Sequence, residues 1–583
     1  MHRKHVLNLI NKLPRSIRQD QIAKLLYTLK AWKILSTNND IENSELKYDT
    51  FFNSVIKAKK LNDIFQSLSK SHRLFELFIG QGNILSKVSD DDLVILFGEV
   101  ELQADFIPVT EMFYTILEGT YDYSVSNQVA ELGVKLLGNK CDEIYAPFSN
   151  SLNLAYFTDR EIYAESMSDE FVIELMKIID GIDINFKHTD TLEQPGYINE
   201  NAPHLLRQFS CTLSFPPMGL AMGKALKSED KFRRFTIHKG RGHRDVAHVE
   251  HILAQTKDRA VVLLPVGLTY RSGSELELRK SLIENNLIEA IIQLPSNLHN
   301  ATSIETTFFI INKNKIDDNI YFLNLKDKQF LGKDGRKTIL SDIDRVVSLY
   351  EGKEEIENIS GLISKETVIS NNFALSIDRY IISKEAAKIK EQLNKYELIE
   401  LQDIALVKRS QLFQDEGEGT PIYEVSPSDL STSGFTIKGS KVKYIDKQLN
   451  KLSTYELKPF DILVSTKGTI GKVGLIGETD GSLVASQAMQ VIRLKEMDEK
   501  LAKILYMYLK SDIGQSLLKQ LVAGVAMPQV STSEIKKFKV PLLDDMQKDK
   551  IVDKYEQEVH LYNELNNIEN NIKQIHSDFL GAK

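Results

Sequence analysis

The chain has 583 residues, of which 42% are hydrophobic and 26% are charged. This composition is ordinary for a globular protein and excludes extensive disorder, while the length predicts about three to five domains. A formal charge of −8 excludes a wholly basic nucleic-acid coat protein, but a local basic surface would still permit DNA binding.

No apolar run approaches the roughly 20 residues that a membrane-spanning helix needs. The segment that follows Met1 lacks the apolar region of a secretory signal. Two cysteines, Cys141 and Cys211, are too few for a disulfide framework or a cysteine-rich zinc site. We therefore expect a cytoplasmic protein.

Residues 1–115 have the pattern of packed helices. Apolar residues recur at helical spacing, which places them on one stripe, and no glycine occurs before Gly80. The stripe consists of Ile22, Leu25, Leu26 and Leu29. We interpret this region as a helical support domain.

Residues 116–330 alternate short apolar runs with amphipathic segments. The runs at 259–265, 287–292 and 306–311 are apolar throughout, as expected for strands that are covered on both faces of a sheet. The intervening helical segments imply parallel crossover connections. The pattern predicts a doubly wound α/β domain, followed by a charged helical connector at 331–395.

Residues 396–543 return to β-branched, turn-rich segments and predict an α+β domain. The final segment, 544–583, carries apolar residues at alternating steps of four and three, which is the pattern of a coiled-coil seam. The seam is short, so we expect it to pack against another helix. Its members are Leu561, Leu565, Ile568, Ile572, Ile575 and Phe579.

Several motifs between residues 121 and 311 follow one another in a recognisable order. They include 144–147, 189–192, 215–219 and 262–267. In this order the chain resembles the modification subunit of type I restriction-modification systems, an adenine-specific DNA methyltransferase. The resemblance implies a cofactor loop for S-adenosylmethionine and a catalytic loop for a flipped adenine.

The cofactor loop of this chain departs from the family's pattern. The family has Asp-Pro-Xaa-Cys-Gly-Ser-Gly-Gly, whose glycines let the backbone approach the cofactor. Here residues 146–153 read APFSNSLN, and the acid at the start is Ala146. Asn150 can adopt a positive φ, but for Leu152 that conformation is strained and its side chain fills space. The Thr-Pro that lies against the family's cofactor is also missing, and residues 123–126 read YSVS.

The catalytic loop departs as well. The family's Asn-Pro-Pro-Phe/Tyr polarises the adenine amino group through the asparagine and stacks its aromatic ring on the base. In this chain the loop is Phe215, Pro216, Pro217 and Met218. A phenyl ring accepts no useful hydrogen bond, and a thioether makes a weaker contact with the base. Together the changed loops indicate a pseudoenzyme.

Two acidic residues remain where the family contacts its cofactor. Glu165 corresponds to the acid that holds the ribose, and Asp190 corresponds to the acid near the adenine. Each is equally well interpreted as an ordinary loop carboxylate. With Ala146 and Asn150 they are the candidate cofactor residues, and S-adenosylmethionine is expected only if the domain is active.

A basic segment, 231–244, follows the catalytic loop and contains no acidic residue. Such a cluster is the best electrostatic candidate for phosphate contacts in an acidic protein, although a solvated loop explains it almost as well. Three histidines near its end could suggest a metal site, but we interpret them as helix-surface residues and predict no metal. The candidate phosphate contacts are Arg233, Arg234, Lys239, Arg241 and Arg244, and the histidines are His243, His248 and His251.

The motifs at 461–473, 485–487 and 527–531 resemble one half of a type I specificity subunit, namely a target-recognition domain and its spacer helix. We interpret Gly468 and Gly471 as hairpin glycines. The resemblance and the residue types favour DNA contacts for four side chains, two as phosphate partners and two as hydrogen-bonding groups. They are Lys467, Lys472, Ser486 and Gln487.

Our leading hypothesis is a DNA-recognition component of a restriction-modification or phage-defence system, with an inactive methyltransferase-like domain. It would bind double-stranded DNA and dock a catalytic methyltransferase, nuclease or translocase, with self-association possible through the terminal helix. The alternative is an active adenine-specific DNA methyltransferase that uses S-adenosylmethionine. A protein-interaction scaffold without DNA binding is a third and weaker alternative.

Overall fold

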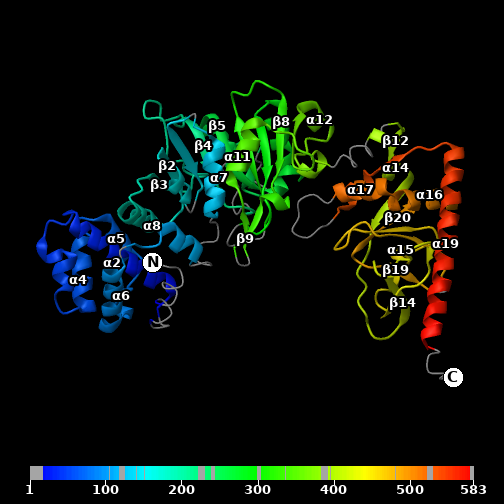
Figure 1. The fold of residues 1–583 in the computed structure, drawn as a ribbon, viewed down its shortest axis with the longest axis horizontal. Coiled ribbons are helices and arrows are strands. Elements are labelled where there is room, and N and C mark those ends of the chain that lie inside the picture. The colour runs from blue at the N-terminus through cyan, green and yellow to red at the C-terminus, as the bar shows by residue number, and fades with distance from the viewer. Residues whose placement is uncertain are drawn as a thin grey trace. The chain divides into compact units, whose positions relative to one another are not determined.

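The computed structural model divides the chain into two compact units, 1–381 and 382–583 (Figure 1). None of the helices in the described part of the chain is long and apolar enough to span a membrane. The structure describes residues 9, 13, 17–103, 105–116, 125–139, 141–149, 152–220, 230–237, 243–298, 304–334, 337–382, 391–393, 395–479, 481–521 and 530–577.

The first unit begins with the predicted helical domain. Its core is organised around the fully buried Trp32 of α2, whose ring contacts four other aromatic rings at centroid distances of 5.4–6.4 Å. A Ser89–Asp92 capping box starts α6. The helices are α2 (Gln19–Thr37), η1 (Ser44–Leu46), α3 (Tyr48–Phe52), α4 (Ala58–Leu68), α5 (Arg73–Gly80), η2 (Leu85–Lys87), α6 (Asp90–Leu102) and η3 (Glu111–Ile116).

A nine-stranded sheet forms the centre of this unit, with the order β11-β8-β6-β7-β5-β4-β1-β2-β3. The connections run outward in both directions from β1 and β4, and β7 is antiparallel to both of its neighbours. The predicted doubly wound α/β fold is therefore confirmed. The strands are β1 (Glu143–Pro147), β2 (Glu161–Ser166), β3 (Asn185–His188), β4 (Phe209–Ser214), β5 (Thr256–Pro265), β6 (Ile288–Gln293), β7 (Thr306–Asn312), β8 (Asn319–Asn324) and β11 (Ser360–Ser364).

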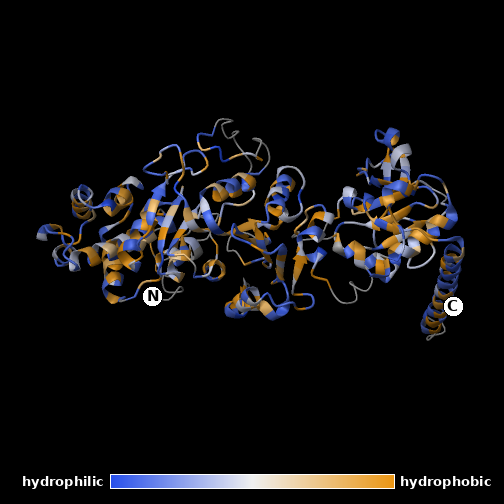
Figure 2. Cartoon of the chain, turned by 90° about the horizontal axis from the view of Figure 1, so that it is seen from above, coloured by the Kyte–Doolittle hydropathy of each residue, from blue (hydrophilic) through white to orange (hydrophobic). Residues whose placement is uncertain are grey.

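Helices cover both faces of the sheet and create two hydrophobic cores. One core contains apolar residues from α7, α8 and α11, and the other contains apolar residues from α9, α10 and α12. Figure 2 shows hydrophobic residues concentrated along the strands. The helices are α7 (Asn127–Leu137), η4 (Asn153–Phe157), α8 (Glu170–Leu175), η5 (Met176–Asp180), α9 (Asp245–Gln255), η6 (Val266–Thr269), α10 (Ser274–Glu284), η7 (Lys328–Phe330), α11 (Ile343–Gly352), α12 (Lys365–Ser370) and η8 (Ile377–Arg379).

The predicted connector at 331–395 is largely part of this domain. The segment contributes a small hairpin, β9 (Leu331–Asp334) with β10 (Lys337–Leu340), and the sheet's edge strand β11. Leu375 and Ile377 are buried in the second core. The charged pattern predicted a connector because charge dominates the exposed faces, while a few apolar residues make the contacts with the sheet.

The second unit combines three small sheets with helices, as the α+β prediction required. The sheet orders are β13-β20-β17-β18-β15, β16-β14-β19 and β12-β21. The strands are β12 (Leu398–Glu400), β13 (Ala405–Arg409), β14 (Thr420–Val425), β15 (Phe435–Thr436), β16 (Lys441–Ile445), β17 (Ile462–Ser465), β18 (Val473–Ile476), β19 (Leu483–Ala485), β20 (Met489–Leu494) and β21 (Lys539–Pro541). The shorter helices are α14 (Leu401–Ile404), α15 (Leu449–Tyr455), α16 (Glu499–Lys510), α17 (Asp512–Gln520) and α18 (Thr532–Lys536).

The terminal helix α19 (Asp545–Ser577) packs along α16 through its first half only. Tyr555 is buried against Tyr506, and Lys510 pairs with Glu558. The predicted seam lies beyond these contacts. Its described members are 47–69% exposed, so the expected partner helix is not supplied by the described part of this unit. These members are Leu561, Leu565, Ile568, Ile572 and Ile575, and Phe579 lies outside the described residues.

Candidate functional site

The predicted cofactor and catalytic loops meet at the carboxyl ends of β1 and β4. These two strands flank the topological switch point, where ligands of doubly wound sheets bind. The Ser214 hydroxyl donates a hydrogen bond of 2.6 Å to the Pro147 carbonyl. The Phe215 amide in turn donates to the Ser149 hydroxyl at 3.3 Å. The two loops that the sequence predicted as cofactor and catalytic loops therefore lie next to each other.

Bulky side chains fill the loop that follows β1. Phe148 and Leu152 have φ values of 61° and 49°, the left-handed region that favours glycine. Both are buried, at 6% and 1% exposure. The Phe148 ring lies 4.5 Å from the His248 ring, and Leu152 belongs to the same core as Phe215. Leu152 therefore adopts the left-handed conformation that is strained for a residue with a side chain, and its side chain occupies interior space. Asn150 lies outside the described residues.

Asn153 joins this loop directly to the segment that precedes α7. Its side-chain amide donates to the Val125 carbonyl at 3.0 Å and to the Asn127 side-chain oxygen at 3.1 Å. Asn153 itself is buried. The loop that was predicted to bind the cofactor and the segment at 125–127 are thus hydrogen-bonded to each other. The sequence predictions did not identify this contact, and only the replacement of a loop glycine by a polar residue could have suggested it.

Glu165 is enclosed at the end of β2. The Tyr145 hydroxyl and the Gly196 amide each donate a hydrogen bond to one of its carboxylate oxygens. His251 Nε2 lies 3.6 Å from the same oxygen that Tyr145 contacts. Burial and the adjacent Glu165 raise the pKa of Tyr145 well above its usual range, so this hydroxyl stays protonated and donates. The carboxylate has internal partners on both oxygens and no exposed surface.

Arg234, predicted to contact phosphate, is instead buried inside this network. Its guanidinium donates to the carbonyls of Thr191 and Leu192 at 2.8 and 2.7 Å, and it pairs with Asp230 at 2.9 Å. It also lies 2.9 Å from His251 Nδ1. A guanidinium can only donate, so His251 carries its proton on Nε2, 2.8 Å from the Tyr145 hydroxyl. Arg234 holds the interior together and has no free face for DNA.

The structure also corrects the prediction for the histidines of α9. His248 and His251 are buried rather than on the helix surface. Burial lowers the pKa of His248 to about 3 and lowers that of His251, so both are neutral at physiological pH. Among the described residues, no group of His, Cys, Asp and Glu side chains could hold a metal ion.

The remaining candidates of the first unit have different surroundings. Arg233 is exposed and Arg244 is half-buried, while Lys239 and Arg241 lie outside the described residues. Asp190 accepts a hydrogen bond of 3.1 Å from the Leu192 amide and so caps its own turn. Ala146 is buried within β1 and, like Pro216 and Pro217, offers no side-chain hydrogen-bonding group, while Met218 offers only a weakly accepting thioether.

In the second unit the motif around residue 468 forms the turn between β17 and β18. Ser465 closes it, because its hydroxyl donates to the Thr469 carbonyl at 2.6 Å and accepts from the Lys472 amide at 2.9 Å. Gly468 and Gly471 have φ values of 71° and 88°. This agrees with their interpretation as hairpin glycines.

Three motif segments that are distant in the sequence converge beside this turn. The Ala488 carbonyl accepts hydrogen bonds from the amides of Thr466 and Lys467 at 2.8 and 3.2 Å. The Thr466 carbonyl accepts from the Val530 amide at 3.0 Å, and Gln490 donates to the Val530 carbonyl at 3.1 Å. We call residues 465–472, 486–490 and 530 the recognition platform.

The predicted DNA contacts belong to this platform. Lys467, Lys472 and Gln487 are exposed, and Ser486 is half-buried. The Ser486 hydroxyl has no hydrogen-bond partner within the part of the chain that the structure describes. The segment at 461 is structural, because Asp461 is buried and its carboxylate accepts two hydrogen bonds from Arg493, at 2.7 and 2.6 Å.

Two family models match successive parts of the chain from residue 172 onward. The N-6 DNA Methylase family matches residues 172–389, and the type I restriction modification DNA specificity domain matches residues 394–574. A methylase subunit of the type I restriction enzyme MpnII of Mycoplasma pneumoniae is 28% identical over 37% of this chain. That of MjaVII of Methanocaldococcus jannaschii is 26% identical over 60% of this chain. The chain spans 41% and 66% of these relatives.

Solved structures support the fold of the first unit. The methyltransferase subunit of a type I restriction-modification system from Streptococcus thermophilus aligns with a TM-score of 0.54 and 18% identity, over 65% of this chain and 98% of that one. Together with the N-6 DNA Methylase match, this likeness shows a methyltransferase-type α/β fold. The chain is a fusion of a methylase domain and a specificity domain of the type I restriction-modification kind.

Proposed function

We propose that the chain is a cytoplasmic DNA-recognition component of a restriction-modification or phage-defence system whose methylase domain transfers no methyl group. The observation that carries this proposal is the direct hydrogen bond between Asn153 and the Val125 carbonyl. It closes the cofactor loop onto the segment that would lie on the other side of S-adenosylmethionine. The family match alone is equally compatible with an active methylase.

The residues at the switch point do not fit S-adenosylmethionine. Leu152 takes the place of a loop glycine and is 1% exposed. Glu165, the expected ribose partner, already accepts hydrogen bonds from Tyr145 and Gly196. Binding the cofactor would require breaking these buried contacts, and each broken contact would leave an unpaired polar group at a cost of about 1–3 kcal/mol.

The catalytic loop supports the same conclusion. Phe215 is 3% exposed, and its ring packs so closely on α7 that a methyl group at Gly133 would lie 3.2 Å from it. Its position is therefore set by the core. Activation of the adenine amino group needs a hydrogen-bond acceptor, which a phenyl ring does not provide. Met218, which replaces the family's stacking aromatic residue, packs on the same core.

Recognition of DNA is assigned to the second unit. Lys467 and Lys472 are exposed cations suited to phosphate, and Gln487 is an exposed side chain that can pair with a base edge. The backbone hydrogen bonds of the recognition platform fix these groups relative to one another. A fixed arrangement of donors and acceptors is what sequence selectivity requires.

The specificity domain also implies association with other subunits of such a system. We propose that a catalytic methyltransferase, a nuclease or a translocase docks on this chain. The exposed seam of α19 is a surface through which the chain would associate with itself or with a second recognition chain.

Removal of the second unit tests the assignment. The chain shortened to residues 1–381, which form one compact unit, is compared with the full chain in selection from random duplexes. We expect the full chain to enrich a defined sequence and the shortened chain to retain only weak, salt-sensitive binding. Enrichment of the same sequence by the shortened chain would refute the assignment.

A further inference from the structure

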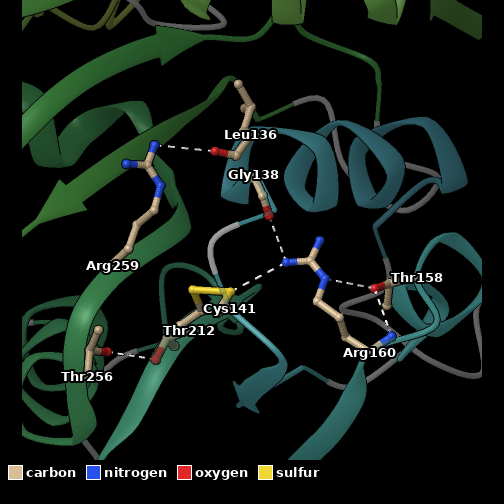
Figure 3. The surroundings of a disulfide bond; sticks show 9 residues. Leu136, Gly138, Cys141, Thr158, Arg160, Thr212, Thr256 and Arg259 are labelled. Carbon is tan, nitrogen blue, oxygen red and sulfur yellow. Dashed lines mark hydrogen bonds between the residues drawn. A yellow bond between two sulfur atoms is a disulfide. The ribbon is translucent and has the colours of Figure 1, made fainter.

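The two cysteines of the protein form a disulfide bond across the centre of the sheet (Figure 3). Cys141 lies just before β1 and Cys211 lies within β4, with their Cα atoms 6.1 Å apart and 70 residues between them in sequence. Both are buried, at 6% and 2% exposure. From the sequence we concluded only that two cysteines are too few for a disulfide framework, and a separation of 70 residues gives no local signal of this single pair.

The disulfide spans the least extensively paired side of β1. Strand β1 pairs with β2 over five residue pairs but with β4 over only two, Ile144 with Cys211 and Tyr145 with Thr212. At the carboxyl ends, the bond from Ser214 to Pro147 links these strands. Near the amino end of β1, the disulfide links the same two strands. The junction at the switch point is thus fastened at both ends, and one fastening is chemically reversible.

Arg160 distinguishes the two sulfur atoms. Its Nη1 atom lies 3.4 Å from the Cys141 sulfur and donates to the Gly138 carbonyl at 2.8 Å. The Thr158 hydroxyl accepts from its Nε at 3.1 Å and so orients the guanidinium (Figure 3). An adjacent guanidinium stabilises a thiolate, which is the nucleophilic form of cysteine. When the pair is reduced, Cys141 is therefore the thiol with a built-in activating cation.

We infer that Cys141 and Cys211 form a reversible thiol–disulfide site that fastens the β1–β4 junction under oxidation, with Cys141 as the reactive thiol. The oxidant is a peroxide. The Cys141 thiolate attacks one peroxide oxygen, the O–O bond breaks, and a sulfenic acid forms as the first water leaves. The Cys211 thiol then attacks the Cys141 sulfur, the S–O bond breaks, and the second water leaves. Two thiols lose two electrons and two protons, and one hydrogen peroxide becomes two waters.

Counting thiols on the full chain is the first test. The protein is reduced, freed of reductant, exposed to equimolar hydrogen peroxide and then labelled with a maleimide in denaturant. We expect two labels before oxidation, none after it, and two again after reduction with dithiothreitol. Peptide mapping should recover one intramolecular link between Cys141 and Cys211. Two reactive thiols after peroxide treatment would overturn the proposal, as would links between chains only.

The order of the steps is tested with single variants. In Cys211→Ser, a sulfenic acid should accumulate on Cys141 and be trapped by dimedone, whereas Cys141→Ser should trap little. Arg160→Gln should slow disulfide formation roughly three- to tenfold at pH 7, and Arg160→Lys should largely restore the rate because it restores the cation. Equal trapping in both cysteine variants, or an unchanged rate in Arg160→Gln, would overturn the assignment of Cys141.

Thermal unfolding tests the fastening of the junction and also checks that the variants fold. Oxidation should raise the melting temperature of the natural protein by roughly 5–10 °C. The double variant Cys141→Ser, Cys211→Ser should melt near the reduced protein and not respond to peroxide or dithiothreitol. A natural protein whose melting temperature is the same in both redox states would contradict the proposal, provided that thiol counting shows that the disulfide had formed.

Discussion

The side-chain amide of Asn153 donates a hydrogen bond of 3.0 Å to the backbone carbonyl of Val125. This bond joins the loop after β1 to the segment before α7. We proposed above that S-adenosylmethionine would lie between these two segments in an active methylase. Here the protein's own side chain makes the connection, and the neighbouring Leu152 fills adjacent space in the core.

Arg233 and Arg234 are adjacent in the sequence but should respond very differently to substitution. Arg234→Met removes the partner of the half-buried Asp230 carboxylate and of two backbone carbonyls. We expect a loss of about 3–5 kcal/mol in the free energy of unfolding, as for other broken buried ion pairs. Arg233→Ala, at an exposed position, should change stability by no more than about 0.5 kcal/mol. Chemical denaturation of both variants measures this difference, and equal losses would contradict the buried network.

The buried Asp245 should make stability depend on pH. Burial, aided by Glu275, raises its pKa to about 6 against the opposing effects of the Gly219 amide, His243 and Arg271. The unfolded state therefore holds fewer protons than the folded state between about pH 4 and 6. The contribution of Asp245 then falls as pH rises through this window, by up to about 3 kcal/mol.

Asp245→Asn isolates this contribution. The amide oxygen of Asn can still accept from the Gly219 amide but does not ionise. We expect the variant to be more stable than the natural protein at pH 7 and similar to it near pH 4. The low pKa of His248 has the opposite effect, since its stabilisation is lost as pH falls below about 6.5, but it is common to both proteins and cancels in the comparison. Parallel stability curves for the two proteins would rule out the effect.

Side chains of the recognition platform should separate affinity from selectivity. Lys467→Ala should weaken binding to all duplexes alike and reduce the slope of log affinity against log salt by about 1, because one phosphate contact is lost. Gln487→Ala should instead reduce discrimination at one base pair, by about 1–3 kcal/mol. Lys451→Ala is the matched control, an exposed lysine outside the platform. Fluorescence anisotropy across a salt series distinguishes these outcomes, and a Lys467 variant that behaves like the control would argue against the platform.

The seam of α19 should mediate assembly. Leu565→Glu with Ile572→Glu would place unpaired charges in an apolar interface, so multi-angle light scattering or pull-down should show loss of association. The control pair, Asn563→Glu with Asn570→Glu, adds the same charge away from the seam. Because Leu565 and Ile572 are 47% exposed, neither pair should unfold the chain. Unchanged assembly in the seam variant would exclude this surface.

Apolar periodicity predicted the fold because it reports the contacts that stabilise it. The helical stripe of Ile22 to Leu29 is buried in the first domain, and the runs at 259–265, 287–292 and 306–311 correspond to the central strands β5, β6 and β7. The role of Gly468 and Gly471 in a hairpin could also be predicted, because a tight turn imposes a local requirement for positive φ.

The interior of the site could not be predicted in this way. Arg234, His248 and His251 carry polar groups, and such residues are usually found on surfaces. Their burial depends on partners that are distant in sequence, such as Glu165 and the carbonyls of Thr191 and Leu192. The local sequence pattern around a residue does not indicate partners that are distant in the sequence. The same applies to the cysteine pair and to the sheet edge formed by β11.

Transfer of tritium from labelled S-adenosylmethionine to DNA, measured on protein that binds duplex in the same buffer, tests directly whether the methylase domain is inactive. We predict no incorporation by the natural chain. We also predict none by Phe215→Asn, because this change restores the acceptor but leaves Leu152 and Asn153 in the cofactor loop. Without a bound methyl donor, the variant would still lack the benefit of holding the two reactants together, which can lower the barrier by about 7–11 kcal/mol. Incorporation by the natural protein, in a preparation free of other methylases, would contradict the proposed inactivity and establish an active adenine methyltransferase.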